Sequence, residues 1–117
     1  MRPSPPVIEE TPEEFFSRTG VLPPSVQDGR QFPRFYFRSV AEALIYKPGG
    51  RDEPKHCFVL TRDLSRGGIS LIHIAQLFPG QRVDLILNGA PPRTAEVAQC
   101  RRLKDGRFLV GCRFKKV

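Results

Sequence analysis

The sequence lacks the features that mark membrane and secreted proteins. It contains no run of 18 apolar residues, which excludes a membrane-spanning helix. The N-terminal segment MRPSPPVIEE carries two acidic residues and no apolar core, which excludes a secretory signal peptide. We therefore expect a cytoplasmic protein.

Cysteine and histidine are few, and their spacing matches no metal site or catalytic motif. The three cysteines, Cys57, Cys100 and Cys112, form no C-x-x-C pair, and their odd number favours reduced thiols. The two histidines, His56 and His73, lie in strand-like segments without a Ser or Cys partner indicated by the sequence. A G-x-x-x-x-G-K-[ST] phosphate loop is also missing. These absences argue against an enzyme and against a metalloprotein.

Positive charge is abundant, and it is concentrated beyond residue 28. The formal net charge is +7. Residues 1–28 contain two basic and five acidic residues, whereas residues 29–117 contain 17 basic and 7 acidic residues. A basic domain of this kind favours an anionic partner, such as a nucleotide, a nucleic acid or an acidic lipid surface.

Only the first 20 residues show a helical pattern. After a Pro-rich tail, the segment TPEEFFSR (residues 11–18) begins with Thr11, which can cap a helix, and Glu14 follows three residues later as in a capping box. We expect a short helix whose Phe15 and Phe16 pack on the rest of the chain. A flexible loop should follow it, so that residues 1–28 form a region distinct from a domain at 29–117.

The remaining sequence is typical of a mainly β protein. Alternating, β-branched and aromatic segments are separated by Gly, Pro and Asp turns, and the turn KDG strongly indicates a hairpin. In the first segment, one face should supply core residues: Phe35, Phe37, Ala41, Ala43 and Ile45. Many short strands imply a closed barrel or a sandwich. The expected strands are 35–46, 56–62, 69–74, 81–87, 94–103 and 107–114.

The segment RQFPR is the first candidate for binding chemistry. Pro33 favours extended or turning backbone, so Arg30 and Arg34 can converge on one ligand from a loop. Two planar, permanently charged guanidinium groups can each bind a phosphate and stack on a purine. The plainer interpretation is a pair of solvated charges at the rim of a barrel.

The segment DLSRGG (residues 63–68) is the second candidate. Asp63 and Ser65 favour turns, and Gly67 and Gly68 allow positive φ, so a plain turn explains the pattern. A carboxylate beside a Ser hydroxyl can also accept hydrogen bonds from the N1–H and N2–H₂ edge of guanine. The glycines would then let a base approach the backbone closely.

Taken together, RQFPR and DLSRGG resemble the two motifs of the PilZ domain family, RxxxR and D/N-x-S-x-x-G. They lie about thirty residues apart in a basic six-stranded pattern, and the resemblance covers roughly residues 29–116. It implies a six-stranded antiparallel β-barrel and a bacterial receptor for the second messenger cyclic di-GMP. Apart from this ligand, it implies no cofactor.

The resemblance also assigns roles to individual residues. Arg30 and Arg34 would contact the phosphates and stack on guanines, Asp63 and Ser65 would hydrogen-bond a guanine edge, and Gly68 would permit close approach. Further candidate contacts are Arg38, Arg66 and Gly67. The chain ends at Val117 without the C-terminal helix of many family members, so the N-terminal helix could cover one end of the barrel. With no attached output domain, such a receptor would signal through a partner protein.

Two other functions stay open. A small basic barrel with Phe35, Tyr36 and Phe37 could bind single-stranded nucleic acid by stacking. That interpretation is disfavoured because Phe35 and Phe37 fall on the predicted core face, and because Asp63 and Ser65 have no role on a phosphate backbone. A PilZ-like adaptor that acts only through protein contacts is the other alternative.

Overall fold

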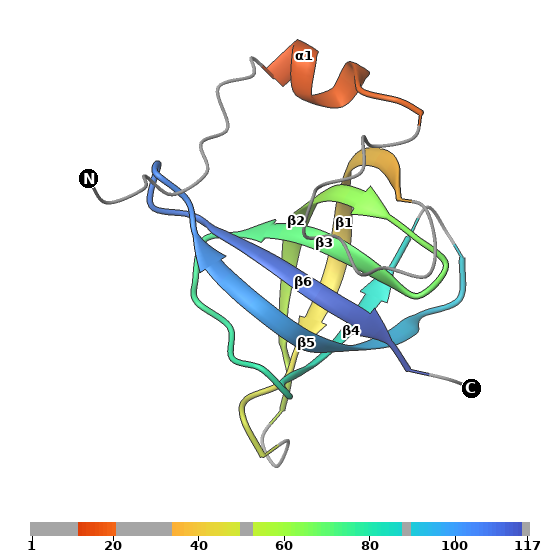
Figure 1. The fold of residues 1–117 in the computed structure, drawn as a ribbon. Helices are drawn as coiled ribbons and strands as arrows, with labels where there is room; N and C mark the ends of the chain where they lie inside the picture. The colour runs from red at the N-terminus through yellow and green to blue at the C-terminus, as the bar shows by residue number, and fades with distance from the viewer. Residues whose placement is uncertain (1–11, 21–33, 50–52, 88–89, 116–117) are drawn as a thin grey trace.

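The computed structural model describes residues 12–20, 34–49, 53–87 and 90–115. One short helix precedes six strands, and the strands close into an antiparallel barrel in the order β1-β2-β3-β6-β5-β4 (Figure 1). The predicted mainly β fold is confirmed, and so is the six-stranded antiparallel barrel that the resemblance implied. The elements are α1 Pro12–Ser17, β1 Phe35–Ile45, β2 Lys55–Leu64, β3 Gly68–His73, β4 Arg82–Ile86, β5 Arg93–Arg102 and β6 Phe108–Phe114.

The length of β1 allows the barrel to close. Its pairing with β2 extends from Phe35 to Ile45, and its last four residues also pair with β4. The KDG hairpin is confirmed: Gly106 adopts φ 90°, and the Leu103 amide donates to the Arg107 carbonyl at 2.7 Å. A glycine suits this turn because positive φ strains other residues.

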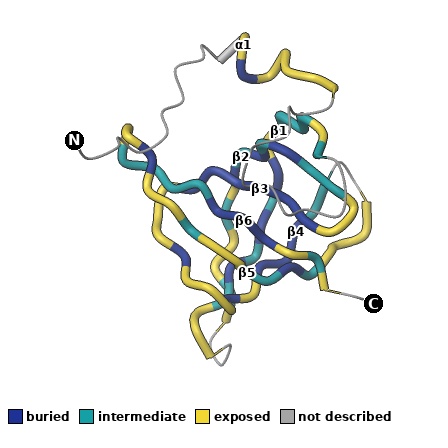
Figure 2. The backbone as a smooth tube through the Cα atoms, in the orientation of Figure 1, coloured by how far each residue is buried: buried dark blue, intermediate teal, exposed yellow. Residues whose placement is uncertain are grey.

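Alternating residues of the strands fill the barrel interior (Figure 2). Val83 and Leu85 are fully buried, as the period-2 pattern predicts. On β1 the predicted core residues Ala41, Ala43 and Ile45 are buried. The same prediction is wrong for Phe35, which is 47% exposed. Phe35 is the first residue of β1, and an irregular register between Tyr36 and Ser39 separates it from the regular part of the strand.

The helix α1 packs on the outside of the barrel through a single aromatic residue. Phe15 is buried against Ile72 and Leu103, with Leu60 and Leu109 at the edge of the cluster. Phe16 is 45% exposed, so the prediction that both aromatics pack is wrong. Consecutive residues of a helix do not face the same way, and this helix has only six residues.

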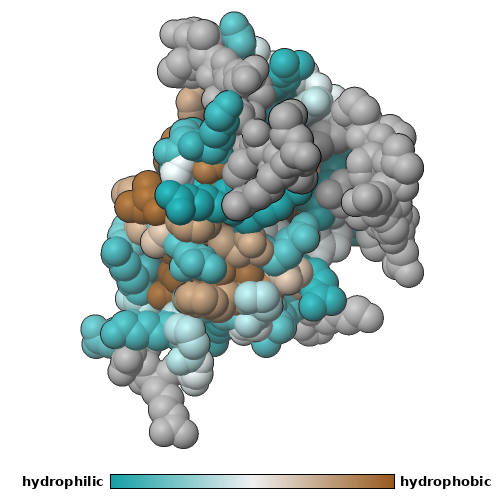
Figure 3. Space-filling model, turned by 60° about the vertical axis from the view of Figure 1, so that its left-hand side comes forward, coloured by the Kyte–Doolittle hydropathy of each residue, from teal (hydrophilic) through white to brown (hydrophobic). Residues whose placement is uncertain are grey.

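Several large hydrophobic side chains of the described chain remain on the surface. Figure 3 shows apolar side chains gathered on one face of the molecule among hydrophilic ones. No helix in the described ranges is long and apolar enough to cross a membrane. The exposed residues are Phe16, Phe35, Val40, Phe58, Ile74 and Phe78.

Candidate functional site

The hairpin between β2 and β3 builds the candidate site. The sequence assigned residues 63–68 to a turn, but Asp63 belongs to β2 and Gly68 begins β3. Only three residues between the strands form the turn, which the Ser65 amide closes by donating to the Gly68 carbonyl at 2.8 Å. Asp63 therefore lies opposite Ser70 in the strand register and is only 1% exposed.

Arg34, the residue before β1, forms an ion pair with Asp63 near the end of β2. The Arg34 Nη1 group donates to Asp63 Oδ1, and it also donates to Ser70 Oγ at 2.9 Å. The other carboxylate oxygen of Asp63 accepts from Arg62 Nη1 at 3.3 Å. One buried carboxylate thus holds two guanidinium groups, and the cluster keeps a formal positive charge.

The Arg34 guanidinium has donor capacity beyond these contacts. Its side chain is 14% exposed, and its buried Nε finds no hydrogen-bond acceptor within the part of the chain that the structure describes. An arginine has five N–H donors in a planar fork, and Asp63 and Ser70 engage only one of its nitrogen atoms in the described contacts. Arg34 can therefore take a further acceptor.

Ser65 organises the turn that follows Asp63. Its hydroxyl oxygen accepts from the amides of Gly67 at 3.3 Å and Gly68 at 3.1 Å. This is the plain-turn arrangement that the sequence also allowed. Hydrogen bonding of Ser65 to a guanine edge stays a prediction.

Gly68 is required by the close approach of a neighbouring strand. A Cβ on Gly68 would lie 2.3 Å from the carbonyl oxygen of Cys112 on β6. Only glycine fits this position without displacing backbone. The barrel itself thus supplies a reason for this glycine, in addition to the predicted approach of a base.

The remaining predicted contacts are distributed around this centre. Arg38 Nε donates to the Arg62 carbonyl at 2.9 Å, and its guanidinium stacks 4.4 Å from the Phe15 ring centroid. Arg38 therefore joins α1 to β2 next to the Arg34 cluster. Arg66 and Gly67 lie exposed in the turn, and Arg30 lies outside the described residues. The ligand contacts of all four stay predictions.

Comparison with protein-family models identifies the fold family. A model described as the PilZ domain matches residues 28–117. The chain belongs to the PilZ domain family. This confirms the resemblance stated from RQFPR and DLSRGG, and PilZ domains form a family of cyclic di-GMP receptors. No curated protein matches the chain significantly.

Sequence reasoning missed two residues of this PilZ site, Ser70 and Arg62. Both contact the predicted pair Arg34 and Asp63 directly. Ser70 could have been found from the hairpin, because closing the turn with a Ser65–Gly68 pair places Leu64 opposite Ile69 and Asp63 opposite Ser70. Arg62 had no such signal, since neighbouring residues of a strand normally point to opposite faces.

The PilZ domain has a second arginine–carboxylate centre, at the other end of β1. Asp84 accepts two hydrogen bonds from Arg82, at 3.0 and 2.9 Å, one from Thr94 at 2.9 Å and one from Tyr46 at 3.0 Å. Burial alone would raise the pKa of Asp84, but the hydrogen bonds from Arg82, Thr94 and Tyr46 outweigh it and hold the pKa below its usual value. This carboxylate accepts two hydrogen bonds on each oxygen, and its role is to join strands of the barrel.

The histidines and cysteines of the PilZ domain are dispersed. His56 Nε2 lies 3.0 Å from Glu42 Oε2 at the surface, whereas His73 is buried on β3. Within the described ranges, no three His, Cys, Asp or Glu side chains are grouped to hold a metal ion. The three cysteines are unpaired, and burial raises the pKa of Cys112 to about 12.

Proposed function

We propose that this PilZ domain is a bacterial cytoplasmic receptor for cyclic di-GMP and has no catalytic activity of its own. Arg30 and Arg34 contact the phosphates and guanines, and Asp63 and Ser65 bind a guanine edge. The observation that carries the proposal is the Arg34–Asp63 pair, which joins the two family motifs in one centre with two guanidinium groups to one carboxylate. Such a centre retains positive charge for an anionic ligand.

Binding at this centre requires an exchange of partners. Asp63 is only 1% exposed and its Oδ1 accepts from Arg34, so we infer that a guanine edge reaches this carboxylate when Arg34 releases Oδ1. A ligand phosphate supplies the new partner for Arg34 in a charge-assisted, bidentate contact. Arg62 keeps Oδ2 of the buried carboxylate paired meanwhile. No charge is left unpaired during the exchange, which avoids the large cost of an isolated buried ion.

The exchange also provides a route to a signal. Residues 18–33 connect α1 to Arg34, and Arg38 stacks on Phe15 of α1 while its Nε donates to the Arg62 carbonyl. We infer that residues 21–34 wrap over the ligand and that α1 shifts relative to the barrel, which changes the surface offered to a partner protein. Hydrogen exchange with and without cyclic di-GMP tests this: unchanged protection at residues 21–34 would contradict the mechanism.

Isothermal titration with cyclic di-GMP tests the receptor proposal directly, with GTP as a nucleotide control. We expect saturable binding of cyclic di-GMP alone, lost in Arg34→Ala and in Arg30→Ala. The second variant leaves every described contact of Asp63 in place, so it separates loss of binding from loss of folding. Arg82→Ala is the matched control and should bind normally. Absence of binding by the folded wild-type protein at high micromolar ligand would refute the proposal.

Single-stranded nucleic acid remains the second candidate because of one observation. Phe35 follows Arg34 directly and is 47% exposed, so it is available for stacking on a base. A short oligonucleotide in the same titration distinguishes the two functions. Oligonucleotide binding that weakens steeply with salt and depends on Phe35 would favour nucleic acid over cyclic di-GMP.

A further inference from the structure

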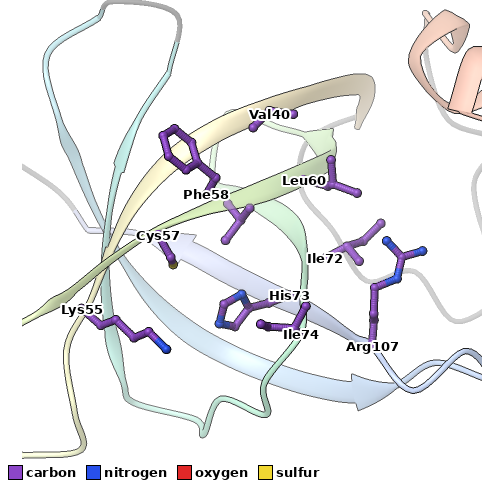
Figure 4. A pocket seen from close by; sticks show the side chains of 10 residues that line it. Val40, Lys55, Cys57, Phe58, Leu60, Ile72, His73, Ile74 and Arg107 are labelled. Carbon is purple, nitrogen blue, oxygen red and sulfur yellow. The ribbon is translucent and has the colours of Figure 1, made fainter.

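A groove on the outside of the barrel lies apart from the Arg34 centre. It has a volume of about 300 Å³ and is bordered by β1, β2 and β3 and by the residue that precedes β6 (Figure 4). Most of its lining side chains are apolar. Three of them are unusually exposed for their type, with Val40 at 53%, Phe58 at 62% and Ile74 at 76%. Exposed apolar residues that gather around one groove mark an interaction site.

The groove continues a surface that already binds a helix. Leu60 and Ile72 line the groove, and both also belong to the cluster that Phe15 covers. The outer faces of β2 and β3 therefore carry one apolar strip, which α1 covers on one side and leaves open on the other. The side chain that covers the strip is Phe15, an aromatic residue next to Glu14 on the short helix α1. This shows which kind of element the strip accepts.

The charged side chains that line the groove are basic. None of the ten lining residues is acidic, and two of them are Lys55 and Arg107, which lie at opposite ends in Figure 4. Asp105 pairs with Arg107 at 2.8 Å, whereas Lys55 has no ion-pair partner in the described ranges. Burial lowers the pKa of His73, and the charge of Lys55 lowers it further, which favours the neutral imidazole. Lys55 is the cation that a partner's carboxylate can pair with.

We propose that this groove is the docking site for a partner protein that presents a short acidic amphipathic helix. An aromatic or large aliphatic side chain of that helix enters the groove between Phe58 and Ile74, and a carboxylate pairs with Lys55. This is the helix-in-groove mode of recognition, in which apolar anchors supply affinity and charge supplies selectivity. The inference rests on the proposed function only for the existence of a partner, since no residue of the Arg34 centre lines the groove.

A random helical peptide library, displayed on phage and selected against the full chain, tests the chemistry of the occupant without bias. We expect enriched peptides to combine a large apolar anchor with Asp or Glu. A synthetic enriched peptide should lose at least about tenfold in affinity, by fluorescence polarisation, on Phe58→Ser and on Lys55→Glu. Phe78→Ser and Lys104→Glu are the matched controls, because both residues are exposed outside the groove, and these variants should bind the peptide as the wild type does.

Three results would overturn the proposal. The first is a selection that yields no peptide whose binding depends on Phe58 or Lys55. The second is enrichment of neutral or basic peptides that bind at the groove. The third is concentration-dependent dimerisation in analytical ultracentrifugation that Phe58→Ser abolishes, which would assign the groove to a second copy of this chain. Ile74→Ser replaces Phe58→Ser if circular dichroism shows that the latter does not fold. Titration of each groove variant with cyclic di-GMP should be unchanged, so the outcome is independent of the receptor proposal.

Discussion

The two ends of β1 carry centres built from similar side chains with different properties. Asp63 lies opposite Tyr36 near the start of β1, and Asp84 lies opposite Leu44 near its end, about 27 Å along the strand. Each carboxylate accepts hydrogen bonds from an arginine, and each centre includes a hydroxyl side chain, Ser70 beside Asp63 and Thr94 beside Asp84. Asp84 receives four hydrogen bonds from one arginine and two neutral donors, whereas Asp63 is shared between two arginines.

The difference lies in what each arginine is left to do. Arg82 forms a bidentate pair with Asp84 and stacks 4.5 Å from the Tyr46 ring centroid, so its capacity is used within the barrel. Arg34 binds Asp63 and Ser70 through one nitrogen only. An arginine–carboxylate pair therefore does not by itself mark a functional site. The surplus of cations over anions, and an Arg34 Nε without an acceptor among the described residues, distinguish the Arg34 centre.

The largest expected effect comes from removing each arginine in turn. Arg34→Met leaves the buried Asp63 with a single, longer contact to Arg62, and should lower the free energy of unfolding by about 3 kcal/mol. Arg82→Met should cost only about 1 kcal/mol, because the Arg82 side chain is 49% exposed and Asp84 keeps Thr94 and Tyr46. Urea unfolding of both variants measures the difference. Equal losses would show that the two centres are equivalent.

The next effect tests whether the turn beside Asp63 is fixed by the barrel. Gly68→Ala places a methyl group against the backbone of Cys112 and should destabilise the protein by about 2 kcal/mol. In the matched variant Gly111→Ala, the new methyl group meets the Gln99 side chain at 3.1 Å, and that side chain can move. Its cost should stay below about 1 kcal/mol. A Gly68→Ala protein as stable as the wild type would contradict the close approach of β3 and β6.

A smaller effect separates stability from binding. Ser70→Ala and Thr94→Val each remove one hydroxyl contact to a centre, and each should cost about 1 kcal/mol of unfolding free energy. Only Ser70→Ala should also weaken cyclic di-GMP binding, by about fivefold, because Ser70 positions Arg34. Unfolding and titration of both variants give the comparison. Weaker binding by Thr94→Val would remove the distinction between the two centres.

The smallest effect is a change in acid sensitivity at the Asp84 centre. The pKa of folded Asp84 lies below the usual value for an aspartate, so its contribution to stability is complete above that usual value and is lost as the pH falls through the folded pKa. Asp84→Asn removes this titration. The free energy of unfolding of the variant should therefore fall less steeply than that of the wild type between pH 4 and the acid limit of folding. Urea midpoints across that range measure the slope, and parallel curves for the two proteins would contradict the assignment.

Much of the fold follows from local patterns in the sequence. The alternation of Val83 and Leu85, the KDG hairpin and the short helix around Phe15 depend on residues close together in the chain, so they could be predicted. The errors occurred where tertiary contacts override the pattern. Phe35 continues the alternation but lies before an irregular pairing, and Phe16 remains exposed outside the cluster that buries its neighbour Phe15.

The candidate site shows the same division. The residue types of Arg34, Asp63 and Ser65 were readable in two short motifs, and so were the basic charge and the β class, because composition and local spacing carry them. Only the tertiary structure decided that β1 closes on β4, that Arg34 reaches Asp63 across 29 residues of sequence, and that Gly68 lies against Cys112. These contacts depend on pairing between segments far apart in the sequence, and no tight turn fixes the register of those pairs.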